Sequence, residues 1–285
     1  MSGTSCLLFF PGTRPELLPK AIASGAGQVC ADLEDAVATD AKAEARASVI
    51  ELLADGAAVP QLVVRINHPA TPDGEADVEA LGRLGGHVRP GRPLEPLTIM
   101  VPKTDSRLEL DTLRESLALT LGPVSLIPVV ETARGLSRVE EIAAADGVSS
   151  IFLGGLDLSV ELGCALEWDA LLYARSRSVL AARLAGVEVI DTPFFDLRDE
   201  EGLRRETERV GRLGFTAKAA IHPLQVPVIH QALAPTDEDL GRARRVIAAS
   251  AREGRGAFLL DGVMIDRPAV QAARRLLSRC GITED

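Results

Sequence analysis

The stretches P-V-V-E-T-A-R-G (Pro128–Gly135) and F-L-G-G-L-D-L (Phe152–Leu158) share one pattern. In each, a short apolar run leads to a carboxylate, Glu131 or Asp157, within a polar or glycine-rich segment. If both runs are parallel strands, both acids lie just beyond the carboxyl ends of the strands, on one face of the sheet. Two carboxylates placed side by side suit Mg²⁺, which binds few protein carboxylates and keeps positions for substrate and water. The alternative is that each acid only caps a helix or belongs to its first turn.

Short apolar runs recur along the chain, and each is followed by a stretch in which apolar residues have helical spacing. Apolar strands that alternate with amphipathic helices indicate a parallel sheet covered by helices, an α/β fold. Eight such units predict a (β/α)8 TIM barrel. A doubly wound open sheet is the alternative, but no G-x-G-x-x-G follows the first strand to support a dinucleotide site. The predicted strands are Leu7–Phe10, Val29–Leu33, Leu62–Ile66, Leu97–Val101, Ser125–Val130, Ser150–Leu153, Val187–Ile190 and Thr216–Ile221.

The chain continues well past the eighth strand, so we expect a barrel over residues 1–233 and a C-terminal helical extension over residues 234–285. Leu224–Leu233 and Asp237–Ala251 have helical spacing, and Thr236 is placed to cap the second of these helices. After a glycine-rich break, Phe258–Arg279 ends in a basic amphipathic helix. Because barrel closure does not need this extension, it could cover the barrel's bottom, form a lid or reach a neighbouring subunit.

Composition narrows the function classes. The chain has 285 residues, 46% of them hydrophobic, which is ample for a large aliphatic core. Its formal charge of −10 argues against nucleic acid or an anionic membrane as the main partner. Four cysteines without C-x-x-C pairing indicate reduced, mostly buried thiols of a cytoplasmic protein. The N-terminal apolar run is too short for a signal peptide, and no segment is apolar for long enough to span a membrane.

Charged and polar residues gather where the predicted strands end, which is where barrels of this kind place their active sites. An Arg at a strand end, such as Arg65, presents a planar fork that suits a carboxylate ligand. The alternative is a structural salt bridge from Arg65 to Asp32 or Glu34. The strand ends carry P-G-T-R-P (Pro11–Pro15) with Lys20 beyond it, D-L-E-D (Asp32–Asp35), R-I-N (Arg65–Asn67), Pro102-Lys103, Glu131, Asp157, D-T-P-F (Asp191–Phe194) and T-A-K-A-A-I-H-P (Thr216–Pro223).

Several of these motifs, in order, resemble the citrate lyase β-subunit-like branch of the HpcH/HpaI aldolase family. The resemblance runs from about Phe9 to the C-terminus. It rests on F-P-G-T-R-P-E, D-L-E-D-A-V-A, V-R-I-N, P-V-V-E-T-A-R-G, G-G-L-D-L-S, D-T-P-F and G-F-T-A-K-A-A-I-H-P-L-Q-V. It implies a Mg²⁺-dependent carbon–carbon lyase on a (β/α)8 barrel. Such enzymes cleave or form a β-hydroxyacyl thioester of the citryl-, malyl- or citramalyl-CoA type, with an acyl thioester and a 2-oxo acid such as oxaloacetate, glyoxylate or pyruvate as the other side of the reaction.

The resemblance also implies roles at the rim. Glu131 and Asp157 are the expected metal ligands, and Arg65 is expected to act catalytically by binding the oxo acid. Backbone N–H groups at the start of the glycine-rich turn could hold the acid's carboxylate as an anion nest. The implied substrate contacts are Arg65, Gly155, Leu156 and Pro193, and Glu34 and Asp35 are expected to orient metal-bound waters.

Coenzyme A would contact Arg14, Lys20 and Lys218 if the resemblance holds at each position. Ala217 stands where many relatives have glycine, and its methyl group could narrow the approach of coenzyme A to Lys218. In D-G-V-M-I-D-R-P (Asp261–Pro268), which resembles the lid motif of stand-alone CoA lyases, Asp266 matches an acid/base residue that reaches a neighbouring subunit. A homo-oligomer, a trimer or a hexamer, is therefore expected. The alternative is that Asp266 only caps the final helix, since D-x-P is a common helix start.

The chemistry suits these residue types. Retro-aldol cleavage removes a proton from an alcohol and leaves a carbanion beside a thioester, so Mg²⁺ and Arg65 would stabilise developing charge and Asp266 would carry the proton. No Schiff base is needed, although Lys103 and Lys218 are alternative candidates for one. Two further functions stay open: a thioester hydrolase of the malyl-CoA type, and a β subunit of a citrate lyase complex that acts on a thioester of an acyl carrier protein. Asp266 and the lid motif favour the self-sufficient CoA enzyme.

Overall fold

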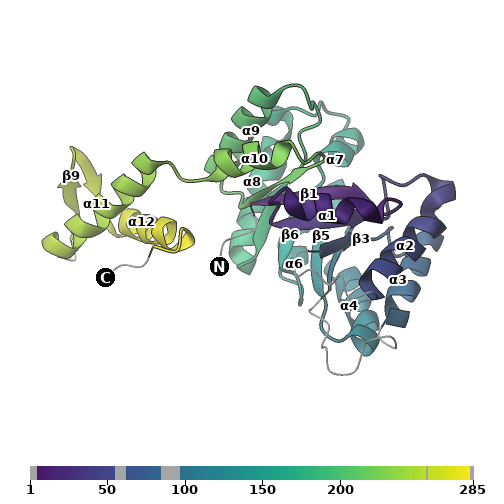
Figure 1. Ribbon diagram of the computed structural model, residues 1–285. Coiled ribbons are helices and arrows are strands. Elements are labelled where there is room, and N and C mark those ends of the chain that lie inside the picture. Colours follow the sequence, from purple (N-terminus) through teal and green to yellow (C-terminus); the bar gives the residue numbers. More distant parts are fainter. Residues whose placement is uncertain (1–4, 55–61, 85–96, 255, 283–285) are drawn as a thin grey trace. The chain divides into compact units, whose positions relative to one another are not determined.

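Eight parallel strands close into a barrel in their order along the chain, because β8 pairs with β1 as well as with β7. The computed structural model describes residues 5–54, 62–84, 97–254 and 256–282 (Figure 1). The closed order of the eight strands confirms the predicted (β/α)8 barrel and excludes the open sheet. The strands are β1 (Cys6–Pro11), β2 (Gln28–Asp32), β3 (Leu62–Arg65), β4 (Thr98–Val101), β5 (Ser125–Val130), β6 (Ser150–Leu153), β7 (Glu188–Asp191) and β8 (Ala217–Ala220).

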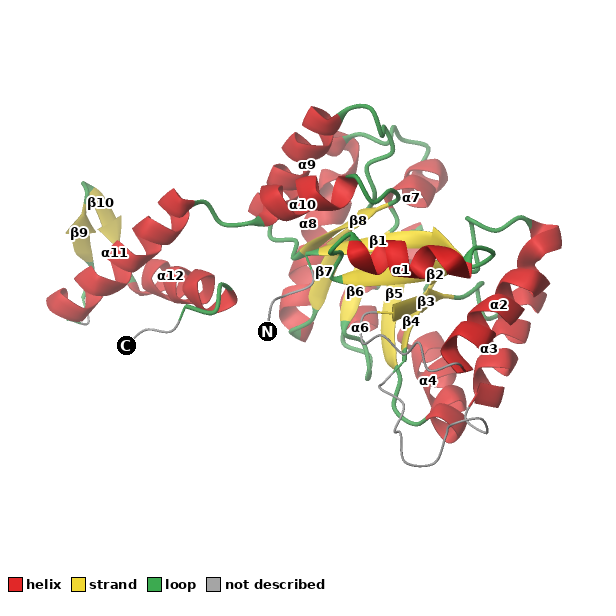
Figure 2. Ribbon diagram, in the orientation of Figure 1, coloured by secondary structure: helices red, strands yellow, loops and turns green. Residues whose placement is uncertain are grey.

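Helices follow the strands and surround the barrel (Figure 2). Their apolar faces pack on the outward side chains of the strands, in clusters that join Val29 and Val64 of the sheet to Val49 and Leu110 of the helices. The helical segments of the barrel are η1 (Pro15–Leu17), α1 (Leu18–Ala23), η2 (Thr39–Ala41), α2 (Lys42–Ala54), α3 (Pro72–Leu84), α4 (Arg107–Leu121), α5 (Ala133–Ser137), α6 (Val139–Ala143), α7 (Gly155–Leu162), α8 (Trp168–Ala185), α9 (Glu200–Leu213) and α10 (Gln225–Leu233).

The strands alternate between two cores, as the two-residue period of a strand requires. Inward side chains form a separate buried cluster that fills the barrel's interior, with members such as Leu7, Met100, Phe152 and Ile190. A side chain directly after one of these residues therefore points outward to the helices. This parity decides which residues of each strand end can reach the interior.

The eighth strand is shorter at both ends than the predicted Thr216–Ile221, and the side chains of Thr216 and Gln225 bond to the backbone at these ends. The hydroxyl of Thr216 donates to the carbonyl of Val189 and accepts from the amide of Val189, both at 3.0 Å. The amide of Ile221 donates to Gln225 Oε1 at 2.8 Å. The other strand boundaries differ from the predicted ones by a residue or two.

Residues from Ala234 onward form a second compact unit with its own core, and Thr4–Leu233 form the first. Thr236 caps α11 (Asp237–Glu253) through a capping box with Asp239, as its sequence position predicts. The unit also contains β9 (Phe258–Leu260), β10 (Val263–Ile265) and α12 (Arg267–Arg279). The antiparallel β9–β10 hairpin was not predicted, although Asp261-Gly262 between apolar residues is a strong hairpin signal. Both turn residues have positive φ, 52° and 77°.

Two other sequence expectations bear on the surface and the core. All four cysteines are free; Cys6 and Cys30 are buried, Cys164 is half-buried and Cys280 is exposed. Half of the thiols, rather than most, are therefore fully buried. Within the described residues, no helix combines the length and the apolar character needed to cross a membrane.

The loop that joins β3 to α3 depends on a glycine. A Cβ on Gly74 would collide with the backbone carbonyl of His68, whereas a Cβ on Gly82 of the same helix would meet only Thr120 Oγ1, at 3.5 Å. We expect Gly74→Ala to lower the free energy of unfolding by about 2 kcal/mol, the usual cost of overpacking. Gly82→Ala, the matched control, should be neutral or gain up to about 1 kcal/mol from its helix propensity. Urea unfolding measures both; equal effects of the two substitutions would contradict the steric reading.

Candidate active site

Glu131 and Asp157 lie at the carboxyl ends of neighbouring strands, as predicted. Glu131 follows β5 and is 3% exposed, and Asp157 is half-buried in the first turn of α7, after β6. Between them, Gly154 packs so closely on Glu131 that a Cβ there would lie 2.5 Å from the Cβ of Glu131 and collide with its carboxylate. The glycine of F-L-G-G-L-D-L is thus needed to bring the turn before Asp157 against Glu131.

Lys103 fixes the Glu131 carboxylate through its backbone. Its amide donates to Glu131 Oε1 at 2.8 Å, and its φ of 48° is unusual for a residue other than glycine. The turn after β4 therefore holds a strained backbone geometry that aims an N–H at the candidate metal ligand. From the sequence, Lys103 was considered only for its side chain, and the contact of its amide with Glu131 was not predicted.

The environment of Glu131 disfavours its charged form. Burial, with added repulsion from Glu34 and Asp157, raises the pKa of Glu131 to about 8, although the Lys103 amide and ammonium oppose this. A carboxylate that serves only as a helix cap has no reason to be buried beside two others. A cation bound between Glu131 and Asp157 would favour the ionised form.

Arg65 is held by acidic residues of the preceding strand end. Arg65 and Asp32 are direct cross-strand partners, and the guanidinium donates to both oxygens of Asp32 at 2.7 and 2.5 Å. Its NH1 also lies 3.1 Å from Glu34 and from Asp35. The alternative of a structural salt bridge therefore describes the polar contacts that Arg65 makes. In addition, the guanidinium carbon lies 5.1 Å from the centre of the Phe9 ring. These partners raise the pKa of Arg65 despite its burial.

Glu34 connects Arg65 to Lys103. Its Oε1 accepts from Lys103 Nζ at 3.0 Å, while its buried Oε2 has no hydrogen-bond partner among the described residues. Burial, partly offset by Arg65, raises the pKa of Glu34. If all of its carboxyl groups were ionised, the connected rim would contain five negative charges against two cations, Arg65 and Lys103, an excess of three. The five are Asp32, Glu34, Asp35, Glu131 and Asp157.

These residues fit a divalent cation with oxygen ligands. Among the described residues no three or more His, Cys, Asp or Glu side chains surround one point as a ligand set, so such an ion would rest on two carboxylates. That is the mode usual for Mg²⁺, which keeps several waters. Glu34 Oε2 is ion-paired with Arg65 but accepts no hydrogen bond among the described residues, so a metal-bound water could donate to it.

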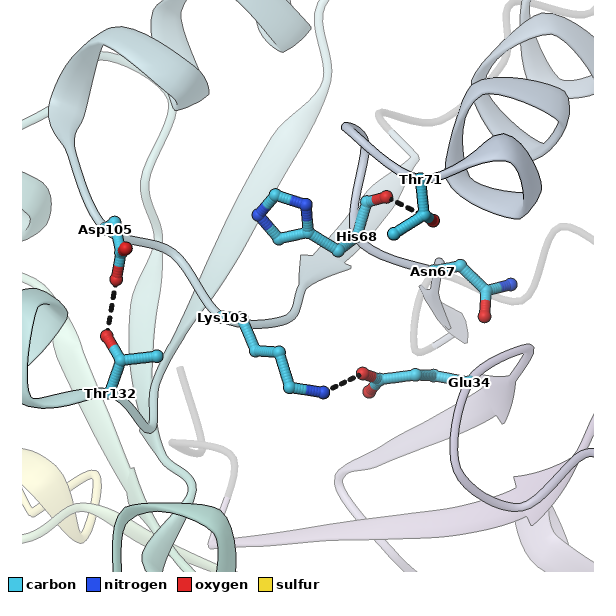
Figure 3. A pocket seen from close by; sticks show the side chains of 7 residues that line it. All are labelled: Glu34, Asn67, His68, Thr71, Lys103, Asp105 and Thr132. Atoms are coloured by element: carbon cyan, nitrogen blue, oxygen red, sulfur yellow. Dashed lines mark hydrogen bonds and ion pairs between the residues drawn. The ribbon is translucent and has the colours of Figure 1, made fainter. Parts of the chain in front are cut away.

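A pocket of about 450 Å³ opens beside the rim (Figure 3). It adjoins Glu131 through Thr132, the next residue, and through Lys103, whose ammonium points across it to Glu34. Four of the lining residues, His68, Thr71, Asp105 and Thr132, were not predicted from the sequence. Thr132 directly follows Glu131 at the end of β5, and that position is the signal that could have identified it. The lining residues are Glu34, Asn67, His68, Thr71, Lys103, Asp105 and Thr132.

Lys218 does not lie where the coenzyme A expectation needs it. It stands between the inward Ala217 and Ala219, so its side chain points outward to the helices. It is 0% exposed, and Nζ donates to Asp191, Glu206 and the Thr192 carbonyl, each at 2.8 Å. An ammonium has three N–H donors, and all of them are used. We therefore remove Lys218 from the candidate coenzyme A contacts and from the Schiff-base candidates.

Lys103 is also a poor Schiff-base nucleophile. Although its partial burial acts in the opposite direction, Glu34, Glu131 and Asp35 raise the pKa of Lys103 above its usual value. A nucleophilic lysine needs a lowered pKa. The rim thus favours charge stabilisation rather than an imine.

The remaining predicted contacts are placed as follows. Arg14 is exposed and pairs with Glu16 at 2.9 Å, and Lys20 is exposed on α1. Leu156 is exposed and Pro193 half-buried. The Gly155 amide donates to Thr192 Oγ1 at 3.3 Å, so it is not free for the expected anion nest.

Asp266 caps α12 in the second unit. Its carboxylate accepts from the amide of Ala269 at 3.1 Å, ahead of Pro268 at the helix start. The capping alternative is therefore present in the structure. A capping carboxylate that keeps a second oxygen can still accept a proton.

Comparison with known proteins gives a consistent picture. The family model HpcH/HpaI aldolase/citrate lyase matches residues 5–223. The citrate lyase subunit beta-like protein of Mycobacterium tuberculosis is 37% identical, over 96% of this chain and 94% of its own length. The L-malyl-CoA/beta-methylmalyl-CoA lyase of Cereibacter sphaeroides is 33% identical, over 94% of this chain and 92% of its own.

A solved structure is similar over nearly the whole chain. The crystal structure of protein CitE from Mycobacterium tuberculosis in complex with magnesium, acetoacetate and coenzyme A has a TM-score of 0.82. It is 36% identical in sequence and covers 98% of this chain and 99% of that one.

The raised pKa of Glu131 predicts a pH-dependent stability in the absence of metal. The folded protein keeps the Glu131 proton up to about pH 8, whereas the unfolded chain releases it near 4.5. The free energy of unfolding should therefore fall as pH rises between these values. Glu131→Gln removes this loss, so we expect it to stabilise the metal-free protein by about 2–4 kcal/mol at pH 8.5 and by much less at pH 5.

Urea unfolding in EDTA at the two pH values measures the difference. Asp157→Asn is the matched control, since its carboxylate is partly exposed, and should show little pH-dependent gain. A Glu131→Gln effect that is equal at both pH values would contradict the buried, uncompensated charge.

Proposed function

The chain belongs to the HpcH/HpaI aldolase/citrate lyase family, in its citrate lyase β-subunit-like branch, and from that premise we propose a Mg²⁺-dependent carbon–carbon lyase acting on CoA thioesters. Its substrate is a β-hydroxyacyl-CoA of the citryl, malyl or citramalyl type. The products are an acyl-CoA and a 2-oxo acid such as oxaloacetate, glyoxylate or pyruvate. The related lyase of Cereibacter sphaeroides is named for thioesters of this class.

The observation that carries the proposal is the burial of Glu131 beside Glu34 and Asp157, where its ionised form needs a balancing cation. Glu131 and Asp157 would hold Mg²⁺, with Glu34 and Asp35 accepting from its waters. When bound, the ion supplies positive charge to the alcohol oxygen and neighbouring carboxylate of the substrate. The related protein CitE was crystallised with magnesium and acetoacetate, which supports an oxo acid beside the metal.

Arg65 and the proton carrier complete the chemistry. Cleavage breaks the bond between the hydroxyl-bearing carbon and the α-carbon of the thioester; the alcohol loses its proton, and the bonding electron pair moves onto the α-carbon. Arg65, fixed by Asp32, supplies preorganised positive potential to the oxo acid. The α-carbon must then be protonated, and Asp266 is the candidate for that transfer.

Coenzyme A would lie over the start of the chain. Arg14 and Lys20 are exposed on the β1–α1 connection and α1, where they can meet phosphates. Lys218 has no part in this contact. A 2-oxo acid in place near Arg65 would lie close to the β6–α7 turn, with Leu156 and Pro193 at its edge.

Two other functions remain alternatives for the same site. A thioester hydrolase would direct water to the thioester carbonyl of the same substrates and release the hydroxy acid and free CoA. A β subunit of a citrate lyase complex would need an acyl carrier protein in place of free CoA. The similar proteins include CoA lyases and citrate lyase β subunits alike.

An assay on a panel of thioesters distinguishes these functions. Malyl-, citramalyl- and citryl-CoA are each incubated with the protein and Mg²⁺, and the 2-oxo acid, acyl-CoA and free CoA are quantified. We expect equal amounts of 2-oxo acid and acyl-CoA, and none from Glu131→Gln. Release of free CoA without oxo acid would show a hydrolase, and inactivity relieved only by an acyl-carrier-protein thioester would show the complex subunit.

We also propose that Asp266 acts on the site of a neighbouring subunit in a homo-oligomer. Asp266→Ala and Glu131→Gln proteins should each be inactive alone. After mixed dissociation and reassembly, some sites would combine an intact metal centre with an intact Asp266, so part of the activity should return. An active Asp266→Ala enzyme would show that this residue is only a cap, and a dead mixture of assembled variants would place its action within its own chain.

A further inference from the structure

A buried cluster of charges lies between the barrel and its helices, on the side away from the interior. Lys218 of β8 and Asp191 of β7 are both fully buried and 2.8 Å apart. Arg175 of α8 donates to the other Asp191 oxygen at 2.9 Å, and Glu206 of α9 accepts from Lys218 at 2.8 Å. Two cations and two carboxylates balance, so the cluster needs no further ion.

Lys218 makes one further contact that the charge balance of the cluster does not require. The third N–H of Lys218 goes to the backbone carbonyl of Thr192, at 2.8 Å. Arg175, the other cation, donates to Asp191 and lies 4.0 Å from Glu206, and it makes no hydrogen bond to Thr192. Lys218 therefore ties the residue after β7 to the cluster, and Arg175 does not.

Thr192 in turn touches the turn that carries the candidate metal ligand. Its hydroxyl accepts from the Gly155 amide at 3.3 Å, and a Cβ on Gly155 would lie within 3.1–3.2 Å of its side chain. On the opposite side of the same turn, Gly154 packs against Glu131. The Gly154-Gly155 turn is thus clamped between Glu131 and Thr192, two residues before Asp157.

We propose that Lys218 is a positioning residue that, through Thr192, holds the Gly154–Asp157 turn in the geometry needed for the metal. This inference rests on the proposed function, since the ion between Glu131 and Asp157 is its premise. Lys218 has no contact with substrate or ion in this role. The cluster on the outer side of the sheet thereby fixes the relative placement of two carboxylates at its carboxyl edge.

Calorimetric titration of the metal-free protein with Mg²⁺ tests the proposal. Lys218→Met should raise the Kd for Mg²⁺ about tenfold, within the range for partners that orient metal ligands. Thr192→Val, which keeps the backbone carbonyl and removes only the hydroxyl acceptor, should raise the Kd in the same direction. Arg175→Met is the matched control: it removes the other buried cation of the cluster, and we expect loss of stability without a change in Kd.

Hydrogen exchange without Mg²⁺ gives a second readout. Amides of residues 154–158 should exchange faster in Lys218→Met and Thr192→Val than in Arg175→Met. If Lys218→Met does not fold, Thr192→Val and Arg175→Met decide the question.

An unchanged Kd in a folded Lys218→Met or in Thr192→Val overturns the positioning role, as does an equal rise in Arg175→Met. A wild-type protein that binds no Mg²⁺ overturns the proposed metal site itself, and the inference with it.

Discussion

The Glu131 carboxylate is almost completely withheld from water beside Glu34 and Asp157, and an ionised group in that position requires compensating positive charge. Two features of the backbone hold the Glu131 carboxylate in this position. The strained turn at Lys103 aims an amide at one carboxylate oxygen, and Gly154 lets the β6–α7 turn approach the other. The protein thus holds an acidic group where it is costly without a cation, which is how a metal site differs from a helix cap.

The rest of the rim is built around that acid. Asp32 and Arg65 meet as cross-strand neighbours, and Glu34 joins Arg65 to Lys103, so charges from three consecutive strand ends are held in one network. Because Asp32, Glu34 and Asp35 hold Arg65, the orientation of its guanidinium is preorganised. In the second unit, the carboxylate of Asp266 caps α12.

The fold could be predicted because each strand is a short apolar run followed by helical spacing, and the closed order of eight strands follows from that count. The placement of Glu131 and Asp157 at one edge of the barrel could be predicted because the carboxyl ends of parallel strands share a face. Lys218 was predicted to contact coenzyme A because the motif match ignored the alternation of side chains along a strand. Lys218 directly follows the inward-facing Ala217, so its side chain faces the helices. The role of the Lys103 amide depends on a φ of 48°, which no residue pattern there announces, whereas Asp261-Gly262 did carry a hairpin signal that was overlooked.

A crystal structure grown with Mg²⁺ and a 2-oxo acid would show whether Glu131 and Asp157 form a metal site. We predict an ion bound by one oxygen each of Glu131 and Asp157 at about 2.0–2.1 Å, with the oxo acid and waters as its other ligands and Arg65 beside the acid's oxygens. An ion bound elsewhere, or an oxo acid bound while the space between Glu131 and Asp157 holds no metal, would contradict it.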